Sequence, residues 1–196
     1  MIQSKKSGLL KLASVMVLFC CLLTGCSNIH EVTPGVLYRS AQLSGSRFDR
    51  LIQKYRIKTV INLRGASTGA KWYQDEVRVM QMDGVTHLDI SLSAVRYVSA
   101  RKIDSIMQVA SSATKPILVH CQGGADRSSL FCAAWRLKCE NASVENSSRQ
   151  LSFVFGHVPF FLNRTQAMDS SFHDYARFLG YRPITSGGKT TWSTNH

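Results

Sequence analysis

The sequence predicts an α/β domain with a central, mostly parallel sheet of four to five strands and helices on both faces. Two observations carry this prediction. Short apolar runs of strand length alternate along the chain with longer segments whose apolar residues recur at helical spacing. The 196 residues are enough for one domain with a proper core and no more. Ligands of such sheets bind beyond the carboxyl ends of the strands, so we expect the chemistry in the loops that follow them.

Each expected element rests on a local pattern. The strands are short and apolar, and they are expected at 35–41, 58–63, 85–90 and 116–120. The helices repeat apolar residues three or four positions apart, as Phe48, Leu51 and Ile52 do. They are expected at 46–55, 72–82, 99–110, 127–139, 143–151 and 165–179. The polar, Gly-rich C-terminal segment is expected to be disordered.

The N-terminus has the pattern of an export signal. Lys5 and Lys6 precede an uncharged apolar run at 12–23, which is too short to span a bilayer comfortably and has the length of a signal-peptide core. The run ends in Leu23-Thr24-Gly25-Cys26, which resembles a bacterial lipobox. That resemblance implies cleavage before Cys26, lipidation of Cys26 and a membrane as partner through the lipid anchor. A plain signal peptide or an N-terminal anchor helix is the alternative.

These patterns divide the chain. We expect a signal peptide at 1–25, a lipidated tether at 26–34, the folded domain at 35–182 and a disordered tail at 183–196. Ser27, and not Asp, follows the lipobox cysteine, which by analogy with enteric bacteria favours the outer membrane. The expected location is therefore the periplasmic side of a bacterial membrane.

Charge and cysteine usage narrow the function classes. The formal net charge is +12, from 24 Lys and Arg against 12 Asp and Glu, and it suits an anionic substrate, a nucleic acid or a membrane surface. No nucleic-acid motif is present, so nucleic acid is not an expected partner. No His/Asp cluster has metal-ligand spacing, so neither a metal nor another cofactor is expected. Removal of the signal and lipidation of Cys26 leave Cys121, Cys132 and Cys139, and this odd number suggests a free reactive thiol.

One loop carries most of the chemical information. It follows the expected strand at 116–120, precedes the expected helix at 127–139 and reads His120-Cys121-Gln122-Gly123-Gly124-Ala125-Asp126-Arg127-Ser128. A loop that ends at a helix N-terminus points several backbone N–H groups at one spot, which makes an anion cradle. Gly123 and Gly124 are expected to take positive φ so that the backbone approaches the anion closely.

The side chains of this loop suit phosphoryl transfer. Arg127 offers a planar fork of donors to two phosphate oxygens. The same field stabilises a thiolate, so Cys121 is expected to be a nucleophile at neutral pH. Ser128 can donate to the sulfur as it leaves in a second step. His120 either orients the loop or is simply a hydrogen-bonded residue at the end of a strand.

The pattern HCxxGxxRS at 120–128 resembles that of the cysteine-based protein tyrosine phosphatases, in their dual-specificity group. The resemblance extends from Leu37-Tyr38-Arg39-Ser40 and Val60-Ile61-Asn62-Leu63-Arg64 to Ala133, patterns typical of small bacterial members. It implies a dual-specificity phosphatase-like fold over the folded domain. It also implies hydrolysis of phosphomonoesters through a phosphocysteine intermediate, with a phosphorylated protein or a small phosphomonoester as substrate and residues 122–127 as the substrate-binding loop.

The family also uses an Asp on a separate loop as general acid. Asp89 ends the expected strand at 85–90 at the spacing from Cys121 that dual-specificity relatives show, so it is the expected acid. The loop lacks a clear Trp-Pro-Asp or Asp-His pattern, and capping a turn is the alternative role. Asp104 is the poorer candidate because it lies inside an expected helix. Arg64 could face the pocket, although a structural pair with Asp75 or Glu76 is the favoured expectation.

The residues around the cysteine also bear on the substrate. Lipid- and inositol-directed members of the family place Lys in this loop, whereas here residues 122–126 contain no base and one acid. Two like charges about 5 Å apart repel by roughly 3 kcal/mol at an effective dielectric near 20. Asp126 is therefore expected to disfavour a second phosphate unless it turns away to cap the helix. This predicts phosphotyrosine first, with phosphoserine and phosphothreonine second and inositol polyphosphates as an alternative.

Two other functions fit a cysteine loop on an α/β sheet. A rhodanese-type sulfurtransferase usually has four residues between Cys and Arg, one fewer than here. An inactive module that binds phosphoproteins would have the same fold, but retention of Cys121, Arg127 and Ser128 argues against it. Gly156 and His157, which lie among several Phe residues, either border the active site or pack in the core, and core packing is the favoured interpretation.

Overall fold

The elements of the domain follow the expected order. The computed structural model describes residues 27–158 and 165–194. Their strands and helices are β1 (His30–Thr33), β2 (Leu37–Ser40), α2 (Gly45–Tyr55), β3 (Thr59–Asn62), α3 (Lys71–Asp83), β4 (Thr86–Asp89), α4 (Ala100–Ser112), β5 (Ile117–His120), α5 (Asp126–Cys139), α6 (Val144–Ser148), a 3-10 turn (Phe153–Phe155), α7 (Gln166–Phe178), β6 (Tyr181–Ser186) and β7 (Lys189–Thr194). The expected signal peptide and Cys26 lie outside these residues.

The central sheet has five strands in the order β1-β2-β5-β3-β4. β2, β5, β3 and β4 run parallel, and only β1 pairs antiparallel. The expectation of a mostly parallel sheet of four to five strands is confirmed. In the register, His120 pairs with Ser40 on one side and Asn62 on the other, and Asn62 pairs in turn with Asp89. The four parallel strands therefore end at one edge, and β5 is central.

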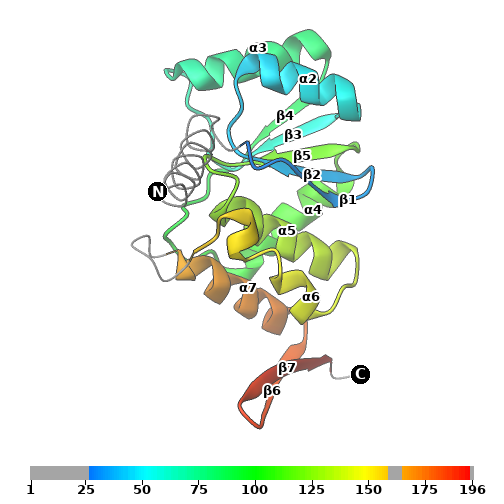
Figure 1. Ribbon diagram of the computed structural model, residues 1–196, viewed down its shortest axis with the longest axis vertical. Coiled ribbons are helices and arrows are strands. Elements are labelled where there is room, and N and C mark those ends of the chain that lie inside the picture. The colour runs from blue at the N-terminus through cyan, green and yellow to red at the C-terminus, as the bar shows by residue number, and fades with distance from the viewer. Residues whose placement is uncertain (1–26, 159–164, 195–196) are drawn as a thin grey trace, which may run out of the picture.

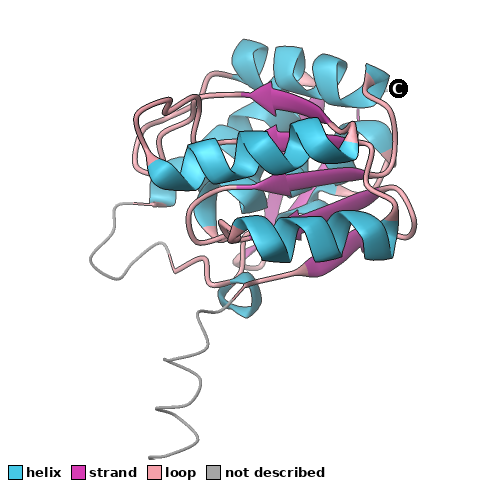
Figure 2. Ribbon diagram, turned by 90° about the horizontal axis from the view of Figure 1, so that it is seen from above, coloured by secondary structure: helices cyan, strands magenta, loops and turns pink. Residues whose placement is uncertain are grey.

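Helices cover both faces of the sheet (Figures 1 and 2). α2 and α3 lie on one face, over a core that includes Phe48, Ile52 and Met80. α4, α5 and α7 lie on the other, around a larger core that includes Phe172 and Tyr175. α5 is the central helix of this layer and is buried around most of its circumference. It starts just beyond the carboxyl end of β5, where the sequence places the reactive loop.

Both ends of the domain differ from expectation. Residues 30–33, expected to be a tether, form the edge strand β1, because His30 and Glu31 pair with Arg39 and Tyr38 of β2. Residues 183–194, expected to be disordered, belong to the β6–β7 hairpin. Gly187 and Gly188 both have positive φ, which is the requirement of a tight hairpin turn.

No helix in the described part of the chain is long and apolar enough to cross a membrane.

Candidate active site

The loop at 121–127 turns the chain from β5 into α5. Cys121 directly follows the last residue of β5 and is only 2% exposed. The helix begins at Asp126, and the Ser129 N–H donates to the Ala125 carbonyl at 2.9 Å. The loop N–H groups and those of the first helical turn have no intrahelical acceptor, and such a strand–loop–helix arrangement directs them at one anion site. The structure thus places Cys121 just after the central strand and Arg127 in the first turn of the following helix, at opposite ends of this loop.

Gly124 is the residue that lets the loop sit close to the sheet. Its φ is +65°, and a Cβ there would lie 2.6 Å from the Ala41 nitrogen and 2.7 Å from the Ser40 carbonyl carbon. A side chain at this position would push the loop away from the end of β2. Gly123 has no positive φ and has open space where a Cβ would be. The expectation of positive φ at both glycines is therefore wrong for Gly123.

Arg127 and Ser128 carry donors that the described protein leaves unused. One Nη of Arg127 makes long hydrogen bonds to the carbonyls of Leu63 and Leu92, at 3.4 and 3.3 Å. Its buried Nε and the buried Ser128 hydroxyl have no hydrogen-bond partner within the described ranges. Buried polar atoms are normally paired, so each unpaired one needs an explanation, and a ligand that binds there is one such explanation. Arg127 is thus held by two backbone carbonyls that follow β3 and β4, while its Nε has no acceptor among the described residues.

Arg39 holds the loop from beneath. Its guanidinium is fully buried and donates to the carbonyls of Gly124 at 2.6 Å and Ala125 at 3.3 Å, and to the Ser129 hydroxyl at 2.8 Å. The other Nη donates to Gln150, and the ring of Phe155 lies 4.4 Å from the guanidinium carbon. These bonds occupy the carbonyls on the underside of the loop. They therefore fix the backbone whose N–H groups must face the anion.

His120 is held by a buried carboxylate on α3. Its Nε2 lies 2.9 Å from Glu76, which also binds Nε2 of His87 at 2.8 Å and accepts a hydrogen bond from Gln42 at 2.7 Å. Burial alone would raise the pKa of Glu76, but the hydrogen bonds from His120 and His87, with the charge of His120 and the bond from Gln42, lower it to about 2. Glu76 is therefore ionised and holds the ring of the residue that precedes Cys121. His120 is thus a hydrogen-bonded residue at the end of a strand, and its role in orienting the loop stays a prediction.

Asp126, the acid of the loop, pairs with a histidine that also binds α7. Asp126 accepts from His157 Nδ1 at 2.8 Å, while His157 Nε2 bonds Asp169 of α7 at 3.0 Å. Burial alone would lower the pKa of His157, but these two carboxylates raise it to about 9. An imidazolium thus joins the loop to α7 and compensates the charge of Asp126. His157 is buried, as the favoured interpretation expects, and it also borders the cysteine loop through Asp126.

Asp89 lies two strands from the cysteine loop. Its register partner Asn62 separates it from His120, and adjacent strands are spaced about 4.8 Å apart. One carboxyl oxygen accepts from the Asn62 amide at 2.8 Å and the other from the Tyr73 hydroxyl at 2.5 Å. That bond, burial and the Asp89 charge raise the pKa of Tyr73 to about 12. In this arrangement both oxygens are acceptors, so the role of Asp89 as general acid stays a prediction.

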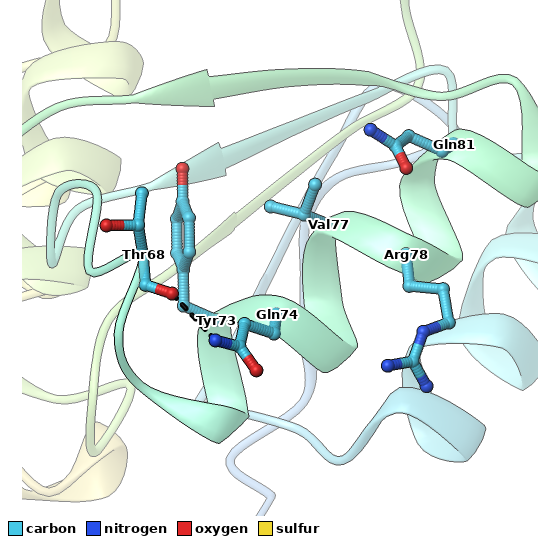
Figure 3. A pocket seen from close by; sticks show the side chains of 6 residues that line it. All are labelled: Thr68, Tyr73, Gln74, Val77, Arg78 and Gln81. Carbon is cyan, nitrogen blue, oxygen red and sulfur yellow. Dashed lines mark hydrogen bonds between the residues drawn. The ribbon is translucent and has the colours of Figure 1, made fainter.

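Asp104 and the hollow beside α3 both lie outside the cysteine loop. Asp104 bonds Lys138 and, at 3.1 Å, Tyr175, and so joins α4 to α5 and α7. A shallow hollow beside α3 (Figure 3) contains no residue of the loop; its lining is Thr68, Tyr73, Gln74, Val77, Arg78 and Gln81. The described residues contain no group of His, Cys, Asp and Glu that could hold a metal ion.

A family model matches most of the chain. The model of a "DSP-PTPase phosphatase fused to NAD+ kinase" aligns with residues 25–176, which include the sheet, the cysteine loop and most of α7. The chain belongs to this DSP-PTPase family. Because the match contains the cysteine loop and the strands that surround it, the resemblance inferred from the motif is confirmed at the level of the whole domain.

Curated relatives and solved structures agree with this membership. The chain is 32% identical over 111 residues to the dual specificity protein phosphatase TpbA of two Pseudomonas aeruginosa strains, which covers 56% of the chain and 46% of TpbA. The chain thus matches about half the length of these relatives. The crystal structure of P. aeruginosa TpbA superposes with a TM-score of 0.56 at 22% identity, over 76% of this chain and 91% of that one. The core catalytic domain of the PP-IP phosphatase SIW14 from S. cerevisiae superposes with a TM-score of 0.59 at 18% identity, over 78% of this chain and 90% of that one. Both show the shared fold.

Three contributors to this DSP-PTPase site were missed by sequence reasoning. In the sequence Arg39 is part of a family pattern, and an arginine inside a short strand is itself a signal of a buried polar contact. The sequence offers Glu76 only as a partner for Arg64. The aromatic neighbours of His157 in the sequence favour a place in the core. No local pattern identifies Glu76, whose partner His120 lies 44 residues away.

Proposed function

We propose that this chain hydrolyses phosphomonoesters through a phosphocysteine intermediate, with phosphotyrosine as the preferred substrate. The observation that carries the proposal is the cysteine loop itself. Cys121 lies at the end of the central strand, and Gly124 and Arg39 fix the backbone of the loop. Arg127 is held by two backbone carbonyls, while its Nε has no partner among the described residues. Retention of these parts supports an enzyme over an inactive binding module.

The reaction has two steps. The Cys121 thiolate attacks phosphorus, the bond to the ester oxygen breaks, and that oxygen leaves with a proton from a general acid, for which Asp89 is the proposed donor. Water then attacks the phosphocysteine, so that inorganic phosphate leaves and the thiolate is restored. Arg127 and the loop N–H groups stabilise the charge on the equatorial oxygens in both transition states. Ser128 donates to the departing sulfur in the second step, and its buried hydroxyl, which has no partner among the described residues, supports this role.

Two variants test the proposed mechanism. Cys121→Ser should abolish turnover of an aryl phosphate, and Arg127→Ala should lower kcat/KM by about a thousandfold, because it removes the fork that binds the transferred group. A chelator should have no effect. Appreciable turnover by Cys121→Ser, or loss of activity on chelation, would contradict the mechanism.

Substrate preference rests on the loop and on the relatives. A solved structure of P. aeruginosa TpbA holds phosphotyrosine, and the loop here has no Lys to meet further phosphates. Inositol polyphosphates are a second candidate, because Asp126 is paired with His157 and the expected repulsion of a second phosphate is correspondingly weaker. The SIW14 neighbour is a PP-IP phosphatase. The deciding measurement is kcat/KM for a phosphotyrosine peptide and for inositol hexakisphosphate at the same ionic strength; a higher value for the latter would contradict the preference.

We also propose that Cys26 is lipidated and that the domain lies on the periplasmic side of a bacterial outer membrane. The sequence Leu23-Thr24-Gly25-Cys26 supports this proposal. Several acyl chains on one residue give stable anchoring, which a single chain would not. Cys26→Ala should leave uncleaved precursor or a soluble form, and fractionation followed by mass spectrometry would detect either. Recovery of the native protein in the cytoplasm would contradict the proposal.

A further inference from the structure

Arg64 lies beside the cysteine loop. It follows the end of β3, where the Leu63 N–H donates to the His120 carbonyl at 2.9 Å, so its backbone runs next to the start of the loop. Arg127 donates to the carbonyl of Leu63, the residue bonded to Arg64. Two guanidinium side chains therefore emerge at the same edge of the sheet, on either side of one peptide group.

The Arg64 guanidinium is held in one orientation. Its Nη1 donates to Gln42 Oε1 at 2.8 Å, and its central carbon lies 3.4 Å from the centre of the Trp72 ring, which covers one face. Gln42 is fixed in turn, because its N–H donates to the Gln122 carbonyl at 3.0 Å and its amide donates to Glu76. A stacked arginine of this kind presents a preorganised planar fork, which suits a carboxylate or phosphate.

No carboxylate of the described residues forms an ion pair with Arg64. The two acids expected to pair with it have other partners: Asp75 binds Lys71 at 2.9 Å and Arg78 at 3.7 Å, and Glu76 binds the two histidines. Burial and the nearby charge of Arg127 lower the pKa of Arg64, whereas Glu76 and Cys121 oppose this effect. The guanidinium thus lies close to both Arg127 and Cys121, where a bound anion would favour its charged form.

We propose that Arg64, stacked on Trp72, binds a second anionic group of the substrate: the carboxylate of an Asp or Glu next to the phosphotyrosine in a phosphopeptide. The inference rests on the proposed function and adds a specificity-determining residue to it. One fork beside the loop suits one additional carboxylate, and residues 122–126 add no base that would bind the several phosphates of a small polyphosphate. If this carboxylate binds equally well before and during the reaction, its effect lies in KM with kcat unchanged.

The test compares three pentapeptides that differ beside the phosphotyrosine: Ala on both sides, Glu before it, or Glu after it. We expect the wild type to prefer one Glu peptide over the Ala peptide by about tenfold in kcat/KM. Arg64→Met should reduce that ratio to about twofold or less, and Arg64→Lys, which keeps the charge without the fork, should give an intermediate ratio. Arg64→Glu should instead prefer a peptide in which Lys stands in the place of that Glu, so that its kcat/KM for the Lys peptide exceeds its kcat/KM for the Glu peptide.

The matched control is Arg50→Met, which removes one exposed positive charge from α2. It should keep the wild-type ratio, whereas an equal loss in Arg50→Met would show that the overall positive field causes the preference and would overturn the proposal. Equal rates for the Ala and Glu peptides in the wild type would overturn the role of Arg64 and leave the phosphatase function intact. No hydrolysis of any peptide would overturn the proposed function itself. A higher kcat/KM for inositol hexakisphosphate that is lost in Arg64→Met would overturn the peptide carboxylate as the occupant.

Discussion

Arg39→Met replaces the apolar stem of the side chain with one of similar length but removes the guanidinium beneath the cysteine loop. Three short hydrogen bonds are lost, to Gly124, Ser129 and Gln150, and each bond from a charged donor contributes about 1.5–3 kcal/mol. Against this loss, the fully buried guanidinium has no carboxylate partner in the described part of the chain, and burying an unpaired charge costs several kcal/mol. We therefore expect the free energy of unfolding to fall by only about 2–3 kcal/mol.

The effect on turnover should exceed the effect on stability. Without Arg39 the carbonyls of Gly124 and Ala125 lose the donor that fixes them, and a displacement of reacting groups by about 1 Å can cost a hundredfold in rate. We expect kcat to fall by roughly that factor in Arg39→Met and by about tenfold in Arg39→Lys, whose ammonium cannot reproduce the fork. Urea unfolding and aryl phosphate turnover measure the two effects, with Arg50→Met as the surface control. A folded Arg39→Met enzyme with wild-type kcat would refute the reasoning.

Three further perturbations follow from the polar contacts of the site. The pKa of His157 is raised to about 9, so its ion pairs stabilise the fold fully below pH 6.5, and this stabilisation is lost as the pH rises through 9. The melting temperatures of the wild type and of His157→Phe should therefore converge near pH 9. A difference in melting temperature that stays constant up to about pH 10 would contradict this. Glu76→Gln should lower the free energy of unfolding by about 3 kcal/mol at pH 7 and also lower kcat, because His120 loses its ionised partner. An unchanged free energy of unfolding together with an unchanged kcat would exclude the orienting role of His120. Asp89→Asn should reduce kcat for an alkyl phosphate more than for a nitrophenyl phosphate if Asp89 protonates the leaving oxygen, and equal reductions would place the acid elsewhere.

The sequence predicts those parts of the site that are formed by neighbours in the chain. β5, the loop and the start of α5 are contiguous, so the apolar strand, the glycines and the arginine appear together in one short motif. Gly124 illustrates the limit of that reasoning, since its need for positive φ was predicted but the close approach of Ser40 and Ala41 that makes glycine necessary was not. The local motif predicts the chemistry of the loop, whereas the need for glycine at Gly124 comes from its packing against the end of β2.

Residues that meet across the sheet could not be predicted in this way. Arg39 contacts the Gly124 carbonyl from 85 positions away, and Asp126 meets His157 from 31 positions away. Their pairing depends on the strand order, which places β2 directly beside β5, and strand order has no local signature. The C-terminal hairpin is a different case. Gly187 and Gly188 were interpreted as signs of disorder, although two glycines between polar strand-like segments also fit a tight turn.

The stacking of Trp72 on Arg64 gives the protein an optical reporter. The chain has three tryptophans, and they lie in three different environments: Trp72 on Arg64, Trp135 in the core with its indole N–H on Thr33, and Trp192 on the hairpin beside His173. Replacing Trp135 and Trp192 by phenylalanine would leave one emitter within 3.4 Å of a guanidinium at the edge of the cysteine loop. The fluorescence of this single indole would then respond to any anion that shifts Arg64, so that ligand occupancy could be followed continuously without a labelled substrate.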